Sequence, residues 1–225
     1  MKIHVFSIMW NEEFILPYFL RHYATFADRI FVIDDHSTDR TAEIAKAHPK
    51  VTLLDYEYEG LVEDDFNKTF AKAYKEHSRQ ADWAMCVDAD ELVYHPHITK
   101  ALEHRQGVLK TTGYFIVSDH LPVGGGQIYD ELFMGVRFPK WDKPIIFDPK
   151  LDVMFGDGRH SVNQPAQPTD IKLLHYRYMS RQYVIDRNTA SYPRVDMTED
   201  QREYRMKKAL DWYDNALAGP LEKVV

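Results

Sequence analysis

Apolar and polar positions alternate in blocks along the first sixty residues of the chain. The blocks predict strands at 2–9, 29–33 and 51–56 and helices at 14–23 and 42–47. We expect Asn11 to cap the first of these helices. The order strand, helix, strand, helix, strand is typical of βαβ units in a parallel sheet. Right-handed crossovers would bring the carboxyl ends of the strands to one edge, where open α/β sheets bind ligands.

The rest of the chain follows a less regular pattern. Its predicted elements are helices at 64–79, 98–104 and 198–218 and strands at 83–87, 107–117, 145–147 and 172–176. Thr198 and Gln201 form a capping box at the start of the last helix. We expect this irregular half to build an acceptor pocket.

The apolar run that starts at Trp83 stops at Asp88-Ala89-Asp90-Glu91. Side chains at i and i+2 of a strand point the same way, so Asp88 and Asp90 would present two carboxylates to one point. Such a pair needs a divalent cation or a basic side chain between them, and Mg²⁺ or Mn²⁺ suits oxygen ligands. The alternative is a solvated turn after a strand. Asp34-Asp35 ends the second strand at the same sheet edge, which favours the binding-site interpretation.

Composition narrows the class of protein. A formal net charge of -7 argues against a nucleic-acid binder that works through a basic surface. The single cysteine, Cys86, excludes an intramolecular disulfide and fits a reducing compartment. Neither a signal peptide nor a run of about 18 apolar residues is recognisable. We therefore expect a cytoplasmic protein, with peripheral membrane association left open.

Three motifs in register resemble a known family. They are Asn11-Glu12-Glu13, the segment Asp34-Asp35-His36-Ser37-Thr38-Asp39-Arg40-Thr41, and Asp88-Ala89-Asp90-Glu91. Together they resemble a family 2 type glycosyltransferase of the GT-A fold. Three later motifs resemble a small soluble bacterial subgroup of such enzymes, often tied to cell-surface polysaccharide: Lys143-Pro144-Ile145-Ile146-Phe147, Gly158-Arg159-His160 and His175-Tyr176-Arg177. The resemblance implies an α/β, Rossmann-like nucleotide-diphospho-sugar transferase fold with a mostly parallel central sheet flanked by helices. We expect one domain over 1–225, with a donor half at 1–95 and an acceptor half at 96–225.

The resemblance also implies roles for individual residues. Asp34 or Asp35 would read the nucleobase, while Asn11 and Glu12 would line the nucleoside pocket. Asp88 and Asp90 would hold Mn²⁺ or Mg²⁺ on the donor diphosphate, with Glu91 in support. The further candidates are Asp130 or Glu131 as the catalytic base, His160 or His175 as an added metal ligand, and Lys143, Arg159, Arg177 or Arg181 as positive charge at the phosphates.

The implied reaction moves a sugar from a nucleotide sugar, with UDP favoured, to a glycan or a lipid-linked sugar. The implied transfer is inverting and adds a single sugar. Transition-state charge on the leaving diphosphate would be stabilised by the metal. The chain departs from the family pattern at His36, where glycine is common. Two alternatives stay open, a sugar nucleotidyltransferase and an inactive GT-A-like binding module. The first is disfavoured because Trp10-Asn11-Glu12-Glu13 stands where that class carries a glycine-rich basic loop.

Overall fold

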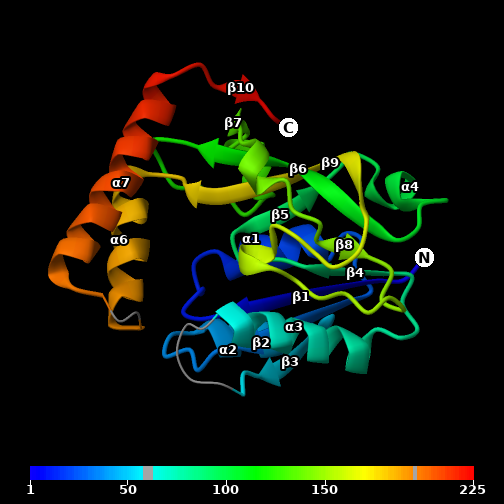
Figure 1. Cartoon of the computed structure of the whole chain (residues 1–225). Helices are drawn as coiled ribbons and strands as arrows, with labels where there is room; N and C mark the ends of the chain where they lie inside the picture. The colour runs from blue at the N-terminus through cyan, green and yellow to red at the C-terminus, as the bar shows by residue number, and fades with distance from the viewer. Residues whose placement is uncertain (58–62, 195–196) are drawn as a thin grey trace.

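The computed structural model describes residues 1–57, 63–194 and 197–225 (Figure 1). Its strands are β1 (Ile3–Met9), β2 (Arg29–Asp34), β3 (Val51–Asp55), β4 (Trp83–Cys86), β5 (Glu91–Tyr94), β6 (Val108–Val117), β7 (Met134–Arg137), β8 (Ile146–Phe147), β9 (Ala166–Tyr178) and β10 (Glu222–Lys223). Its helices are α1 (Leu16–Tyr23), α2 (Thr41–Ala47), α3 (Glu63–His77), α4 (Ile98–Leu102), α5 (Ile128–Glu131), α6 (Arg181–Ser191) and α7 (Glu199–Ala218). Short 3-10 turns are η1 (Pro139–Trp141), η2 (Asp157–Arg159) and η3 (Tyr192–Arg194).

The described strands form one ten-stranded sheet. Its main path runs β10-β7-β6-β8-β4-β1-β2-β3, and β9 pairs with both β5 and β6. The run β4-β1-β2-β3 is parallel throughout, as the first sixty residues predict. The strands β8, β6, β7 and β10 continue the sheet through antiparallel pairs, and β9 runs parallel to β6. The α/β class with helices around a central sheet is confirmed.

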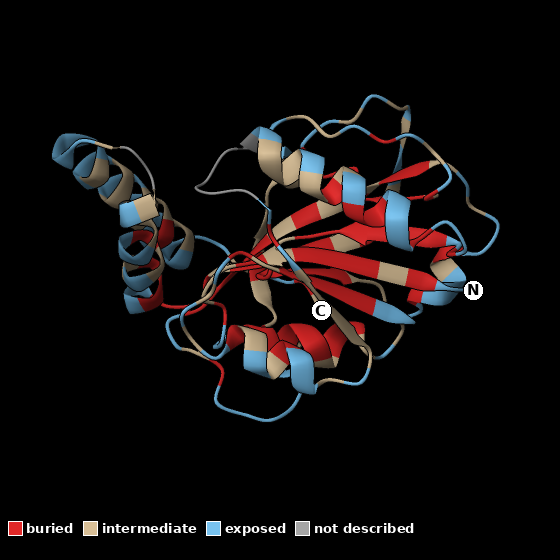
Figure 2. Ribbon diagram, turned by 90° about the horizontal axis from the view of Figure 1, so that it is seen from below, coloured by how far each residue is buried: buried red, intermediate tan, exposed pale blue. Residues whose placement is uncertain are grey.

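Both faces of the parallel strands are buried, as is usual where crossover helices cover a sheet. Figure 2 shows buried strands in the middle of the molecule with helices on either side. On one face, Val5 and Ile30 belong to the same apolar cluster as Phe19 of α1. On the other face, Phe6 clusters with Phe70 of α3. Successive residues of β1 therefore face opposite layers, which explains its continuous apolar sequence.

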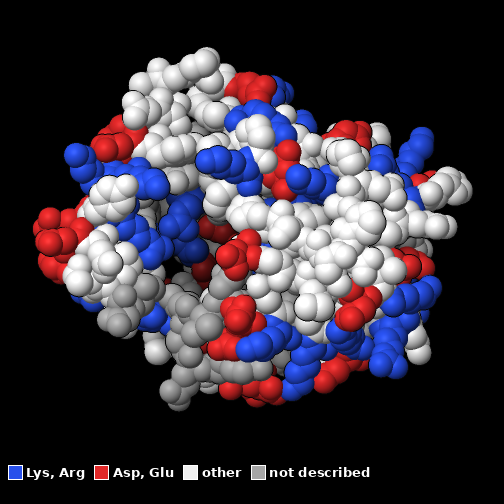
Figure 3. All heavy atoms as spheres, in the orientation of Figure 1, with Lys and Arg blue, Asp and Glu red and all other residues white. Residues whose placement is uncertain are grey.

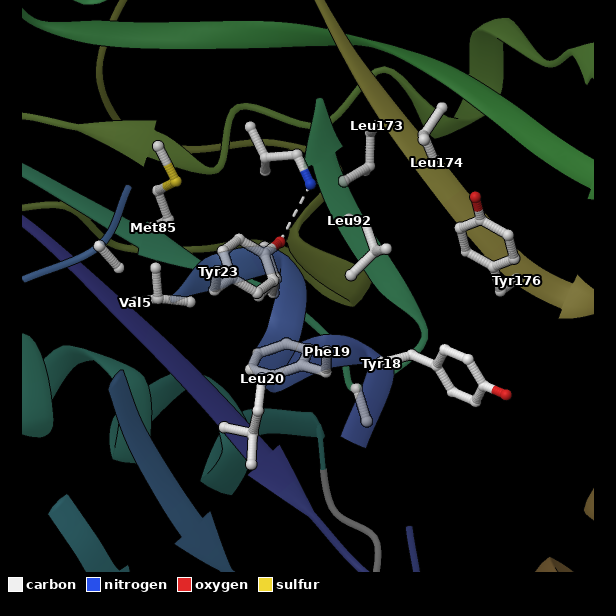
Figure 4. Close-up of a cluster of buried hydrophobic side chains, with 14 of the residues drawn as sticks. Val5, Tyr18, Phe19, Leu20, Tyr23, Met85, Leu92, Leu173, Leu174 and Tyr176 are labelled. Atoms are coloured by element: carbon white, nitrogen blue, oxygen red, sulfur yellow. Dashed lines mark hydrogen bonds between the residues drawn. The ribbon is translucent and has the colours of Figure 1, made fainter. Parts of the chain in front are cut away.

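Helix α1 carries the contact that ties the core to the site. Pro17 lies in its first turn, where a missing N–H costs little. Figure 4 shows Tyr23 reaching from α1 toward the strand that follows the acidic segment. Its hydroxyl accepts a hydrogen bond from the Val93 N–H at 3.0 Å and donates one to the Glu91 carbonyl at 2.9 Å. The core therefore anchors β5 directly after Asp90.

Helices α6 and α7 form a pair at one end of the sheet (Figures 1 and 2). The capping box at Thr198 and Gln201 is confirmed, and α7 ends before Gly219. Tyr213 of α7 clusters with Phe115 of β6, which holds this pair against the sheet. None of the helices in the described ranges is both long and apolar enough to cross a bilayer.

Several sequence expectations differ from the structure. Asn11 does not cap α1, because its φ is 52° and its side chain bonds across to Thr38 instead. The predicted strand at 172–176 is only part of the longer β9, whereas the strand expected within 107–117 is confirmed as β6. Helix α6 and strand β5 have no counterpart among the predicted elements. The run of β5 is too short, and the apolar pattern of α6 too weak, for periodicity to reveal them.

Candidate functional site

The carboxyl ends of β1, β2 and β4 lie at one edge of the sheet, because these strands are parallel neighbours. Residues 11–13, 34–35 and 88–91 follow the three strands directly. Figure 3 shows acidic side chains on the floor of a hollow at this edge and Lys and Arg side chains along its α6–α7 side. The structure therefore brings together the acidic segments that the sequence analysis singled out.

Asp88 lies in a turn rather than in a strand. Strand β4 ends at Cys86, so the expected i, i+2 geometry of a strand does not apply to Asp88 and Asp90. The Asp88 carboxylate binds the Arg159 guanidinium and lies 3.4 Å from Lys143 Nζ. Burial alone would raise the pKa of Asp88, but these two cations hold it below its usual value. With a side chain 43% exposed, Asp88 is the carboxylate of the turn that a ligand can reach.

Asp90 is almost completely buried and has a different pair of cations. His175 Nε2 lies 3.3 Å from one carboxylate oxygen, and an Arg187 Nη lies 3.6 Å from the other. Burial favours the neutral acid, yet His175 and Arg187 bring the pKa of Asp90 far below its normal value. The sequence analysis expected either a divalent cation or a basic side chain beside Asp88 and Asp90. In the structure, basic side chains contact both carboxylates.

Glu91 fixes the shape of the acidic turn from inside the protein. It is fully buried, and one carboxylate oxygen accepts hydrogen bonds from Lys143 Nζ at 2.6 Å and from Trp141 Nε1 at 3.2 Å. Its other oxygen accepts the Asp88 N–H at 3.2 Å. Because Glu91 also opens β5, which pairs with β9 at His175, the turn is held by both neighbouring segments.

Glu12 extends the network toward β1. Its carboxylate binds Arg187, and its N–H donates to Thr41 Oγ1 at 2.7 Å. Burial raises the pKa of Glu12 to about 7, and the Asp90 and Asp88 charges also raise it. The positive charge of Arg187 lowers it by less than burial raises it. Arg187 therefore joins Glu12 and Asp90, two segments that are far apart in sequence.

The second-strand acids meet another arginine. Arg194 Nη2 lies 2.7 Å from Asp35 Oδ2, and its guanidinium stacks 4.5 Å over the Trp10 ring. Burial raises the pKa of Asp35, although Arg194 opposes that effect. One buried oxygen of Asp34 and one of Asp35 accept no hydrogen bond within the described structure.

His36 occupies the position where glycine is common in the resembling family. Its φ is 57°, in the left-handed region that glycine enters without strain. Ser37 and Thr38, which follow it, bond to Asn11, with the Asn11 N–H donating to Ser37 Oγ at 3.0 Å. Asn11 therefore holds the two loops at this edge together.

The two candidate histidines differ. His175 is buried against Trp141, with ring centroids 5.3 Å apart, and one of its nitrogens contacts Asp90. His160 is exposed and packs edge-on to the same Trp141 at 4.9 Å. Burial and the nearby Lys143 charge lower the pKa of His160. Of the two, the structure puts His175 in direct contact with the Asp88–Asp90 turn.

Asp130 and Glu131 bond to their own loop. Asp130 accepts the Gln127 N–H at 2.9 Å in a capping box. Glu131 accepts the Val123 and Gly124 N–H groups at 2.9 and 2.8 Å, which lowers its pKa. No ion pair or hydrogen bond in the described ranges joins either carboxylate to the acidic turn. The structure does not bring them together with Asp88 and Asp90.

The donor atoms suit a cation that arrives with a substrate. Among the described residues, no three His, Cys, Asp or Glu side chains gather as a metal site. Mg²⁺ commonly takes one or two carboxylates and completes its shell with water and phosphate oxygens. The half-exposed Asp88 fits that pattern, whereas Asp90 is only 4% exposed. The site therefore fits a metal bound jointly by the turn and a diphosphate.

Arg187 and Arg194 are the site residues that the sequence analysis missed. It assigned positive charge to Lys143, Arg159, Arg177 or Arg181. Of these, Arg181 lies on the outer side and pairs with Asp214 at 3.5 Å. The missed arginines lie on α6 and η3, in a segment where no periodic signal indicated a helix. Only the excess of arginine after residue 176 pointed to them.

Comparisons with known proteins agree with this geometry. Residues 5–108 match the model of Glycosyl transferase family 2. A search of curated proteins found no match. Residues 1-349 of S. aureus TarS share the fold, with a TM-score of 0.53 and 16% identity over 96% of this chain and 71% of that one.

A second solved structure overlaps over a smaller region. It is glucosyl-3-phosphoglycerate synthase from Mycobacterium tuberculosis, crystallised with Mn²⁺, UDP and glucosyl-3-phosphoglycerate. The match has a TM-score of 0.38 and 18% identity, and it covers 51% of this chain and 44% of that chain. The family match and the fold, taken with the acidic turn after β4, lead to one conclusion. Residues 5–108 are similar to glycosyl transferase family 2, and the chain has the GT-A fold.

Proposed function

We propose that the chain moves a sugar from a UDP-linked donor to a hydroxyl of a glycan or lipid-linked sugar, with inversion and with a divalent metal. The observation that carries the proposal is the convergence of three acidic segments at one sheet edge beside cations from the second half. In the reaction, the acceptor oxygen bonds to the anomeric carbon while the bond to the diphosphate breaks. The acceptor proton passes to a base.

The nucleoside end of the donor would lie against Asp34 and Asp35. The contact of Asp35 with Arg194, whose guanidinium stacks on Trp10, supports that assignment. Asn11 would hold the loop after β2 in place through its hydrogen bonds to Ser37 and Thr38. Glu12 would contribute through its bond to Arg187.

The diphosphate would lie at the half-exposed Asp88. Mn²⁺ or Mg²⁺ held by Asp88 and Asp90 would neutralise the charge that develops on the leaving diphosphate. Lys143 and Arg159 already direct positive charge to Asp88 and are the side chains nearest to that role. His175 would hold the turn in place through Asp90, with His160 at the rim.

Asp130 or Glu131 as the base stays a prediction. Both carboxylates accept loop N–H groups, so they need to exchange these bonds to meet an acceptor. Asp130→Asn and Glu131→Gln, assayed separately for transfer, test the assignment. Normal turnover in both variants would show that neither carboxylate is the catalytic base and that another acid serves as the base.

The place of the reaction is also part of the proposal. The only cysteine, Cys86, is buried as a free thiol, which fits a reducing cytoplasm. A role in cell-surface polysaccharide synthesis follows from the resemblance to the bacterial subgroup.

The experiment measures UDP binding by calorimetry and thermal shift, with and without Mn²⁺, and slow hydrolysis of a panel of nucleotide sugars. We expect metal-dependent binding of UDP in the native protein and its loss in Asp88→Asn. Asp211→Asn, an exposed acid of α7, is the matched control and should bind UDP normally. Far-ultraviolet circular dichroism checks that each variant is folded.

Other outcomes distinguish the alternatives. A nucleotidyltransferase would make a sugar nucleotide and pyrophosphate from a nucleoside triphosphate and a sugar phosphate. An inactive binding module would bind neither nucleotide nor metal but would retain a polysaccharide. No nucleotide binding under any metal condition contradicts the proposed transfer.

A further inference from the structure

One segment of the second half brings two arginines to the acids that follow β1, β2 and β4. The segment consists of helix α6 and the turn η3. Arg187, on α6, binds Glu12 and lies 3.6 Å from Asp90. Arg194, on η3, lies 2.7 Å from Asp35. Both arginines therefore contact carboxylates of the predicted donor site.

The two arginines differ in how firmly they are held. Arg187 joins two carboxylates from different loops, so its release would leave two buried charges without a partner. Within residues 1–57, 63–194 and 197–225, Arg194 forms an ion pair with a single carboxylate, that of Asp35. Arg194 can therefore leave its partner at a smaller cost. A rotation of its side chain is enough, because Arg187 keeps α6 in place.

The Arg194 guanidinium makes two contacts that a nucleobase would make at this position. Its Nη2 group donates a hydrogen bond to Asp35 Oδ2, as the imide N–H of a uracil ring would. The planar group also lies over the Trp10 ring, with its central carbon 4.5 Å from the ring centroid, as a stacked base would. Arg194 therefore reproduces both the hydrogen bond and the stacking of a uracil ring.

Asp35 is closed to a ligand while Arg194 stays in this position. The Asp35 side chain is only 2% exposed, and its Oδ2 accepts the Arg194 hydrogen bond. Its other oxygen, Oδ1, is buried as well. Arg194 itself is 14% exposed, so part of it can be reached from solvent. A base that is to bond to Asp35 must therefore displace the Arg194 side chain.

We propose that Arg194 is a latch on the nucleobase site, which the base of the donor displaces from Asp35 and Trp10. The inference rests on the proposed transfer, which assigns the nucleobase to this acid. The imide N–H of the incoming base replaces the guanidinium N–H at Asp35, so the buried carboxylate keeps a hydrogen bond. A ring without such a donor would leave that carboxylate unpaired, which is costly. Arg194 thereby selects bases that carry an N–H at this position.

The latch also lowers the affinity of the site. A protein that is competent to bind in only a fraction of its molecules binds the ligand more weakly by that fraction. Removal of the Arg194 side chain should therefore strengthen nucleoside binding. A residue that contacts the bound donor would have the opposite effect, so the direction of the change decides between the two roles.

The test measures dissociation constants of uridine and 3-methyluridine by ligand-observed NMR and of UDP with Mn²⁺ by calorimetry. Uridine reports on the base site alone, because it carries no phosphate, and 3-methyluridine has the same ring without the imide N–H. In Arg194→Ala we expect uridine and UDP to bind about tenfold more tightly, which corresponds to a latch that is open in about one molecule in ten. The gain for 3-methyluridine should be less than about threefold, because this ring cannot pair with Asp35.

Two further variants complete the set. Arg194→Lys should bind uridine with an affinity between those of the native protein and Arg194→Ala, because an ammonium group keeps the ion pair but does not stack flat on Trp10. Arg79→Ala, an exposed arginine in the turn after α3, is the matched control and should change none of the constants. Circular dichroism checks the fold of each variant. If Arg194→Ala does not fold, Arg194→Lys decides, since the latch requires a gain of about twofold or more there.

Weaker or unchanged uridine binding in Arg194→Ala would overturn the proposal. Equal gains for uridine and 3-methyluridine would also overturn it, because displacement would then not involve Asp35. If UDP binds the native protein and Arg194→Ala does not strengthen it, only the latch fails and the proposed transfer stands. If no variant binds uridine or UDP under any metal condition, the proposed transfer fails and the latch fails with it.

Discussion

Removal of the Lys143 charge should strongly destabilise the protein, because Lys143 neutralises a carboxylate that has no access to water. Lys143 is 2% exposed, and its Nζ lies 2.6 Å from the carboxylate of Glu91, which is fully buried. Removal of one partner of a buried ion pair lowers the free energy of unfolding by about 3–5 kcal/mol, because the other charge stays buried without a partner. In Lys143→Met, Glu91 keeps the Trp141 and Asp88 N–H bonds. We therefore expect the lower end, about 3 kcal/mol.

The second half of this prediction is a rescue. Lys143→Met combined with Glu91→Gln removes both charges, so we expect the double variant to be about 1–2 kcal/mol more stable than Lys143→Met alone. Urea unfolding followed by tryptophan fluorescence and circular dichroism measures the free energies. Lys140→Met, an exposed lysine on the same segment, is the control and should change stability by less than about 0.5 kcal/mol. A cost below about 1 kcal/mol for Lys143→Met, or no rescue in the double variant, would refute the reasoning.

Three further predictions concern other parts of the fold. Burial lowers the pKa of His22 to about 4, so as pH falls the unfolded protein binds a proton at His22 before the folded protein does. The free energy of unfolding should therefore drop by roughly 2–3 kcal/mol between about pH 6.5 and 4. Denaturation measured across this pH range should show a smaller drop in His22→Gln. A Cβ on Gly113 would lie 2.4 Å from the Trp141 carbonyl oxygen, so Gly113→Ala should cost about 1–3 kcal/mol and lower the melting temperature. Thr198→Ala removes the α7 cap and should cost about 1 kcal/mol in urea unfolding, with Thr198→Ser close to native.

The parallel half of the fold could be predicted because its signals are local. The strands β1, β2 and β3 are continuous apolar runs separated by helical spacing, and β4 stops at the acidic segment. Neighbouring parallel strands then necessarily bring Asp35 and Asp88 to the same edge. The second half carried less information. Its strands pair across long sequence distances, as β6 does with β9, and such pairing leaves no periodic trace near either partner.

The candidate site was predictable in its acids and only in part in its basic residues, because Lys143, Arg159 and His175 were expected there and Arg187 and Arg194 were not. Asp88, Asp90 and Asp35 follow strands directly, so chain order was enough to bring them together. Arg187 meets Glu12 across 175 positions of sequence, and nothing local distinguishes it from the exposed Arg181. The geometry of the acidic turn was also hidden, because the end of β4 at Cys86 depends on its partner strands rather than on its own residues.

The double anchoring of the acidic turn has a consequence for redesign. Glu91 belongs to β5, which pairs with β9, and the counter-charges of Asp88, Asp90 and Glu12 all come from later in the chain. A chimaera that joins a foreign second half to residues 1–95 would therefore change the ionisation of these three carboxylates.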